Sequence, residues 1–110
     1  MIYIRGQYIN EMCKNKQQIE EISNSWDTGF LNQLREGAFS RELYNRLYSA
    51  IMQLDIQEHE QIDRELIRLL WFIPIFMYRM KEYFPDIPSK ECDALREQLE
   101  NAIERVFGYP

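Results

Sequence analysis

The chain has 110 residues, of which 45% are hydrophobic and 14% aromatic, and its net charge at neutral pH is −5. This composition excludes a disordered chain, and its four glycines and four prolines are too few for a turn-rich β fold, so one helical domain over residues 1–110 is predicted. The excess negative charge lies in residues 55–110, which argues against direct nucleic-acid binding because phosphate backbones demand clustered lysine and arginine.

The two cysteines, Cys13 and Cys92, lack the spacing of a zinc site or a disulfide scaffold and are predicted to be reduced, mostly buried thiols. The first four residues are too short for the apolar part of a cleaved leader, so a cytoplasmic protein is expected. Residues 1–7 fit a strand, a helix or a loose arm, and the sequence does not choose among them.

Apolar residues at helical spacing begin at Tyr8 and predict a first helix that is bent near Gly29 and stopped by Gly37. Ser40 is the predicted N-cap of a second helix, and Phe39 is placed to form a hydrophobic staple with Tyr44. The predicted core line of this second helix consists of Leu43, Leu47, Ile51 and Leu54.

Asp55 and Glu58 resemble a capping box at the start of a long central helix, in which Pro74 predicts a kink because proline removes a backbone donor. The core line of this helix is predicted to contain Ile62, Leu66, Leu69, Leu70, Ile73, Met77 and Met80. A last helix after Ser89 completes an antiparallel four-helix bundle, with a core stripe of Cys92, Leu95, Leu99, Ala102, Ile103 and Val106.

The central helix has a second apolar face, because Trp71, Ile75 and Tyr78 lie opposite its core line on a helical wheel. Two interpretations stay open. In the first, neighbouring helices cover both faces; in the second, this face is exposed as a protein interface or the seam of a homodimer. Its nine apolar residues from position 69 are too short to cross a bilayer, so no membrane insertion is expected.

Five acids and one base occur within residues 55–65 and form the candidate electrostatic surface: Asp55, Glu58, Glu60, Asp63 and Glu65. Part of this charge suits the first turn of a helix, whose free amides and dipole favour carboxylates. Tyr44 and Tyr48 lie one turn apart on the preceding helix and are predicted flanking anchors, although half-buried packing fits them equally well. The segment therefore predicts a binding surface for a basic protein.

Catalytic patterns are incomplete. The stretch from His59 to Asp63 resembles the zinc motif H-E-x-x-H, but Asp63 replaces the second histidine and the chain has no other. Cys13 has no histidine base near it in the sequence, and no phosphate or dinucleotide fingerprint occurs. The sequence predicts a protein that is not an enzyme and has no catalytic residue, no metal site and no cofactor.

A tyrosine-bearing helix that runs into an acidic turn resembles the small acidic immunity proteins of bacterial toxin systems, of the colicin or contact-dependent growth inhibition type. The resemblance covers the general character of residues 40–110, including the run Leu70-Trp71-Phe72-Ile73-Pro74 and the closing Val106-Phe107-Gly108-Tyr109-Pro110. It implies an antitoxin that binds and neutralises a cognate toxin domain with a basic surface, such as a nuclease. The competing hypothesis is a helical adaptor or regulator that forms a homodimer through Trp71, Ile75 and Tyr78.

Overall fold

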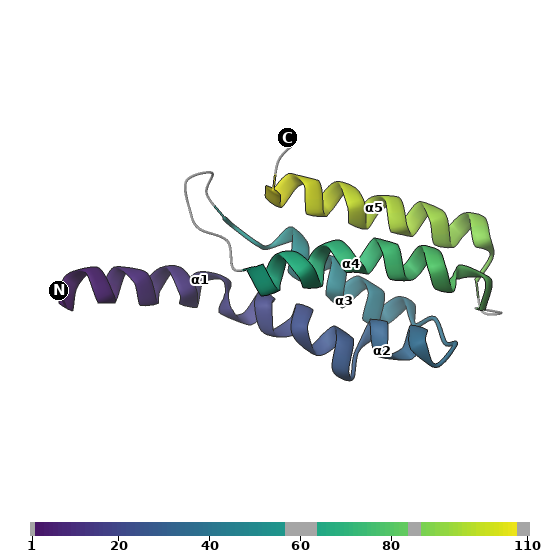
Figure 1. The fold of residues 1–110 in the computed structure, drawn as a ribbon, viewed down its shortest axis with the longest axis horizontal. Coiled ribbons are helices and arrows are strands. Elements are labelled where there is room, and N and C mark those ends of the chain that lie inside the picture. Colours follow the sequence, from purple (N-terminus) through teal and green to yellow (C-terminus); the bar gives the residue numbers. More distant parts are fainter. Residues whose placement is uncertain (1, 57–63, 84–86, 108–110) are drawn as a thin grey trace.

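The computed structural model describes residues 2–56, 64–83 and 87–107, with side chains from residue 15 onward, and these residues form helices and their connections (Figure 1). No strand occurs in this part of the chain, so the all-α prediction is confirmed. The elements are α1 (Ile2–Asp27), α2 (Phe30–Arg35), α3 (Arg41–Met52), α4 (Arg64–Met80), the 3₁₀ turn η1 (Lys81–Tyr83) and α5 (Ser89–Phe107).

The helices lie side by side along the long axis of the molecule, and α3 and α5 run opposite to α1 and α4 (Figure 1). Each of α1 and α5 contacts both α3 and α4, so α4 lies between α1 and α5. The N-terminal half of α1 extends beyond the other helices (Figure 1). Since α1 begins at Ile2, residues 2–7 are helical rather than a strand or a loose arm.

The predicted first helix is in fact two helices, separated at Thr28 and Gly29. The backbone of Gly29 turns back onto α1, where its N–H donates to the carbonyl of Asn24 at 3.0 Å. A Cβ atom at this position would lie 2.8 Å from Cα of Ser25, closer than packed atoms approach. The absence of a side chain at Gly29 therefore permits a sharp break instead of a gentle bend.

Gly37 ends α2 as predicted, with the positive φ of 86° that glycine adopts without strain. Its N–H donates to the carbonyl of Leu34 at 2.9 Å, and the N–H of Ala38 donates to the carbonyl of Gln33 at 2.9 Å. These two bonds form a Schellman motif. The motif reverses the chain between α2 and α3.

The predicted start of α3 is also confirmed. Oγ of Ser40 accepts a hydrogen bond from the N–H of Leu43 at 3.2 Å. The rings of Phe39 and Tyr44 stack with 6.2 Å between their centroids, which is the expected staple. At the other end of α3, Nη2 of Arg105 from α5 donates at 3.0–3.2 Å to three backbone carbonyls, those of Ile51, Met52 and Leu54.

The central helix does not begin at Asp55, because Asp55 and Ile56 are not helical. The side chain of Asn15 on α1 holds this segment at two points: the N–H of Asp55 donates to its Oδ1 at 2.9 Å, and its Nδ2 donates to the carbonyl of Asp55 at 3.2 Å. These bonds fix the backbone of Asp55 outside a helix. The predicted capping partner, Glu58, lies outside the described residues.

The buried core follows the predicted stripes of α3, α4 and α5 and joins them to Ile22 of α1 and to α2. Leu43, Leu69, Met80 and Val106 are only partly buried at the edge of this core, and Pro74 lies buried inside α4. Across the three described segments, no helix combines the length and the apolar character needed to cross a membrane.

Candidate protein-binding surface

The outer face of α4 carries four large hydrophobic side chains that remain exposed. Their exposed fractions are 40% for Trp71, 42% for Phe72, 44% for Ile75 and 57% for Tyr78. We call these four residues the α4 apolar surface. Neighbouring helices do not cover it, because α1 and α5 pack against the flanks of α4 and leave its outer side open.

Two aromatic neighbours hold the edges of the α4 apolar surface. Trp71 stacks on Phe107 of α5, with 6.0 Å between ring centroids, and Phe72 packs against Trp26 of α1 at 5.6 Å. Trp26 in turn contacts Phe76 edge-on at 5.4 Å. The exposed rings are therefore ordered by the fold before any partner arrives, which lowers the entropy cost of binding.

Sequence reasoning identified Trp71, Ile75 and Tyr78 but missed Phe72. A signal for Phe72 existed: at 100° per residue it lies about 60° from Ile75, on the same side of the helix as the other three residues. Taken together, the four side chains present about 400 Å² of exposed surface, given that a whole aromatic side chain offers roughly 150–250 Å². Apolar patches of this size on a soluble domain often mark binding sites.

A groove of about 410 Å³ runs along the α5 side of this surface. Its walls combine apolar and charged side chains from α4 and α5, namely Trp71, Pro74, Ile75, Tyr78, Arg79, Arg96, Glu100 and Glu104. The groove makes the α4 apolar surface concave at one edge, where a protruding side chain of another protein can be received.

Tyr78 is held at the end of this groove by two cations. Nζ of Lys81 lies 4.5 Å from the ring centroid of Tyr78, and the guanidinium of Arg96 lies 5.6 Å from it. The two cations are themselves fixed by ion pairs: Lys81 with Asp93 at 3.5 Å, and Arg96 with Glu100 at 2.6 Å. The phenol ring is thus positioned while more than half of it stays open to solvent.

The predicted acidic surface is described only at its ends. Asp55 and Glu65 are exposed, whereas Glu58, Glu60 and Asp63 lie outside the described residues. Glu65 lies 3.6 Å from Arg68, one turn further along α4, and both side chains are largely solvated. An exposed pair of this kind contributes little to stability.

Tyr44 is not a surface anchor, which corrects the sequence prediction. Its side chain is 1% exposed, between the rings of Phe30 and Tyr48, and its hydroxyl donates to the carbonyl of Leu95 at 2.7 Å. Burial raises the pKa of this phenol above its usual range, and the nearby Tyr48 adds to the shift. Tyr48 is partly buried and packs against the core. The helical wheel placed Tyr44 on a flank, but α2 and α5 close over that flank.

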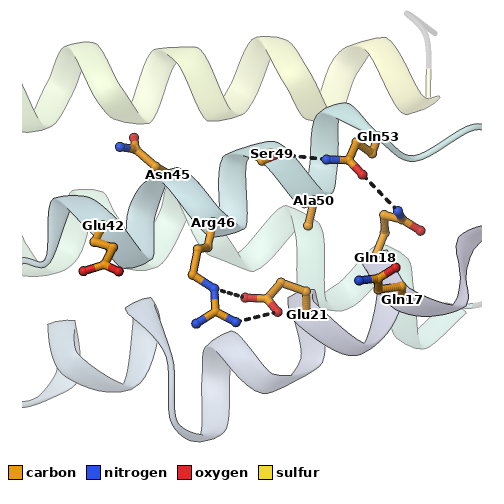
Figure 2. Close-up of a pocket in the computed structure, with 9 residues that line it drawn as sticks. All are labelled: Gln17, Gln18, Glu21, Glu42, Asn45, Arg46, Ser49, Ala50 and Gln53. Atoms are coloured by element: carbon orange, nitrogen blue, oxygen red, sulfur yellow. Dashed lines mark hydrogen bonds and ion pairs between the residues drawn. The ribbon is translucent and has the colours of Figure 1, made fainter.

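A second groove, of about 480 Å³, lies between α1 and α3 and has a polar lining. Figure 2 shows Arg46 of α3 reaching across it to Glu21 of α1, with both Nε and Nη2 3.1 Å from the carboxylate oxygens. Gln18 donates to Gln53 at 3.2 Å on the same side (Figure 2). These contacts link the two helices across the groove, although Oε1 of Gln18 is buried there without a hydrogen-bond partner among the described residues.

Candidate catalytic groups were also located. Cys92 is a free, buried thiol, as predicted, and burial raises its pKa, with a further contribution from Asp93. A buried thiol with a raised pKa is a poor nucleophile. Among the described residues, no three His, Cys, Asp or Glu side chains gather where they could hold a metal ion. His59 lies outside these residues, and so does the side chain of Cys13.

The candidate site is therefore an ordered apolar surface on α4 with a charged groove beside it. Comparison with known proteins adds no family to this picture, because no family model, curated protein or solved structure matches the chain significantly.

Proposed function

We propose that this chain is a cytoplasmic, non-catalytic domain that binds another protein through the α4 apolar surface. The observation that carries the proposal is the exposure of four adjacent large hydrophobic side chains, from 40% to 57%, on a helix whose opposite face is fully buried. Tryptophan, tyrosine and phenylalanine are enriched where proteins contact each other, because each buries much area at small entropy cost.

The surroundings of this surface support the proposal. Charged residues border the apolar centre at both ends of α4, with Arg68 towards its start and Arg79 and Glu82 towards η1, and all three are exposed. A hydrophobic centre within a polar rim is the usual organisation of a protein interface. The ring contacts with Trp26 and Phe107 keep the centre ordered.

The finer architecture belongs to the same proposal. We infer an antiparallel four-helix bundle formed by α1, α3, α4 and α5, supported by the pairwise contacts among these helices. We also infer a bend of α4 at Pro74, since proline cannot donate to the carbonyl of Leu70.

The test is co-expression with the products of the neighbouring reading frames, followed by purification of the tagged chain. A specific partner should co-purify with the wild type but not with Ile75→Lys, which places a charge at the centre of the surface. Met52→Lys is the matched control, because Met52 is similarly exposed, at 42%, but lies on α3. Equal capture by all three proteins would contradict the proposal.

A second candidate is neutralisation of a bacterial toxin with a basic surface, favoured by the exposure of Asp55 and Glu65 at the two ends of the acidic segment. This binding should lose its association rate steeply as salt rises, because exposed charges are screened. Lethality of the upstream reading frame, relieved by the wild type but not by an Asp63→Lys, Glu65→Lys double variant, would support it. Relief by the double variant, or a harmless frame, would exclude it.

A further inference from the structure

We propose that the occupant of the α4 apolar surface is a second copy of this chain, with the two α4 helices packed antiparallel about a two-fold axis at Ile75. The inference rests on the proposed function, because it names the partner of the same surface. Its basis is a complementarity between the two ends of α4.

The exposed residues of α4 and η1 form one continuous stripe. At 100° per residue, all of its members lie within about 60° of Ile75 on the helix surface. The stripe contains Arg68, Trp71, Phe72, Ile75, Tyr78, Arg79 and Glu82, each of which is exposed. It is apolar in the middle and charged at both ends, and the charges at the outermost positions have opposite signs.

A two-fold axis at Ile75 reverses the order of residues along the second α4 and places each flank of the helix against the same flank of its copy. Ile75 then meets its own copy, and Trp71 meets Tyr78 of the second copy, because both rings lie on the α5 side of α4, four and three residues from Ile75. Pairs of aromatic rings add stabilisation beyond the area they bury. The apolar centre is thus matched to itself.

The next positions outward are complementary as well. Phe72 and Arg79 lie on the same flank of α4, three and four residues from Ile75, so the guanidinium of one copy faces the phenyl ring of the other, a favourable cation–π arrangement. Nearby, Arg79 already lies over the ring of Phe72 of its own chain, at 5.9 Å.

The outermost pair fixes the orientation. Arg68 and Glu82 lie seven residues on either side of Ile75, about 10 Å along the helix axis. An antiparallel pair of helices brings Arg68 against Glu82 twice, whereas a parallel pair would bring Arg68 against Arg68. With a crossing angle of about 20°, the helix axes are displaced by less than about 4 Å at these positions, which long side chains can span.

The size of the surface indicates a reversible dimer. Its apolar area of about 400 Å² per copy, with the charged ends added, stays near or below the roughly 800 Å² per partner of a standard interface. We therefore expect a dissociation constant in the micromolar range or weaker, and a dimer that forms as the protein is concentrated.

Analytical ultracentrifugation over a dilution series from millimolar to low micromolar protein tests the proposal. The wild type should shift from dimer to monomer on dilution, and Ile75→Lys should dissociate at least about 100-fold more readily, because two charges would be buried face to face. Met52→Lys should match the wild type. A wild type that is monomeric throughout, or a dimer that survives Ile75→Lys with unchanged circular dichroism, overturns the proposal.

Charge exchange tests the orientation. Arg68→Glu and Glu82→Arg should each weaken the dimer about tenfold, since each converts two attractive pairs into repulsive ones. The double variant, with both charges exchanged, should recover wild-type affinity to within about threefold. Additive weakening in the double variant would exclude the pairing of Arg68 with Glu82.

Cysteine cross-linking gives an independent measurement in a Cys13→Ser background. Ile75→Cys should cross-link to itself, whereas Arg68→Cys should cross-link only when mixed with Glu82→Cys. Self-cross-linking of Arg68→Cys would indicate a parallel dimer and overturn the proposal. A monomeric wild type that still captures a different protein through Ile75 would refute the second copy as partner while leaving the proposed function standing.

Discussion

Replacement of Tyr44 by phenylalanine measures how far this tyrosine belongs to the core. The change removes only the hydroxyl, which donates to the carbonyl of Leu95 at 2.7 Å. The aromatic ring at position 44 keeps its contacts with the rings of Phe30 and Tyr48. A hydrogen bond in this setting contributes about 1 kcal/mol to the free energy of unfolding. We expect a melting temperature about 5 °C lower, as this loss implies for a domain of about 100 residues.

Two further variants make the measurement decisive. Tyr44→Ala should cost about 4 kcal/mol, because it empties a fully buried ring site. Tyr48→Phe should stay within about 0.5 kcal/mol of the wild type, because Tyr48 is only partly buried. Urea unfolding followed by circular dichroism gives all three values. A Tyr44→Ala protein that unfolds within 1 kcal/mol of the wild type would refute the burial argument and return Tyr44 to the surface.

The pH dependence of the same variant provides a second check. Burial raises the pKa of Tyr44 in the folded protein, so the folded state keeps its proton while the unfolded state, with an ordinary pKa of about 10, loses it. Its contribution to stability is therefore complete below about pH 10 and is lost as the pH rises towards the folded pKa. Since Tyr44→Phe lacks this loss, the stability difference between variant and wild type should narrow above pH 10.

Three other predictions follow from the described contacts. Arg105→Gln should lower the free energy of unfolding by about 1–2 kcal/mol, because it removes the hydrogen bonds to three carbonyls at the end of α3. Arg41→Gln breaks an exposed ion pair with Glu91 and should change the free energy of unfolding by less than about 0.5 kcal/mol in the same urea titration. Gly37→Ala should cost about 1 kcal/mol from its positive φ alone, since the new methyl group meets nothing closer than 3.6 Å, and Gly37→Asn should cost less. Cys92 should resist alkylation in the native protein and react in denaturant, as peptide mass spectrometry can measure; rapid native labelling would contradict its burial.

The fold was predictable where the signals are local. Gly37 and Ser40 specify a helix end and a helix start through their own backbone and side chain, and both predictions are confirmed. The break at Gly29 and the non-helical Asp55 were not predictable in the same way. Each depends on a contact with another part of the chain. Gly29 approaches the backbone of Ser25 closely, and Asp55 forms two hydrogen bonds with Asn15, forty residues away in sequence.

The candidate site shows the same division. Helical phase correctly separates Trp71, Ile75 and Tyr78 from the core line of α4, because phase depends only on spacing. Helical phase does not predict which sides of a helix are packed against other helices. The spacing on its own helix predicts that Tyr44 can reach a partner, but α2 and α5 bury its ring. The spacing also allows neighbouring helices to cover Trp71, but its side chain stays exposed to solvent.

The position of α4 between α1 and α5 explains why its outer face is not part of the buried core. A helix packed on neighbours such as α1, α2 and α5 needs an apolar arc somewhat wider than 100° to bury its stripe, and the buried side of α4, from Leu66 to Met77, supplies it. The α4 apolar surface lies beyond this arc and adds nothing to the packing of the monomer. Exposed apolar area of this size favours association, so an isolated monomer would carry a cost in solubility that disappears when the surface is covered. A partner that covers it, with Ile75 at the centre, therefore accounts for residues that the fold alone does not require.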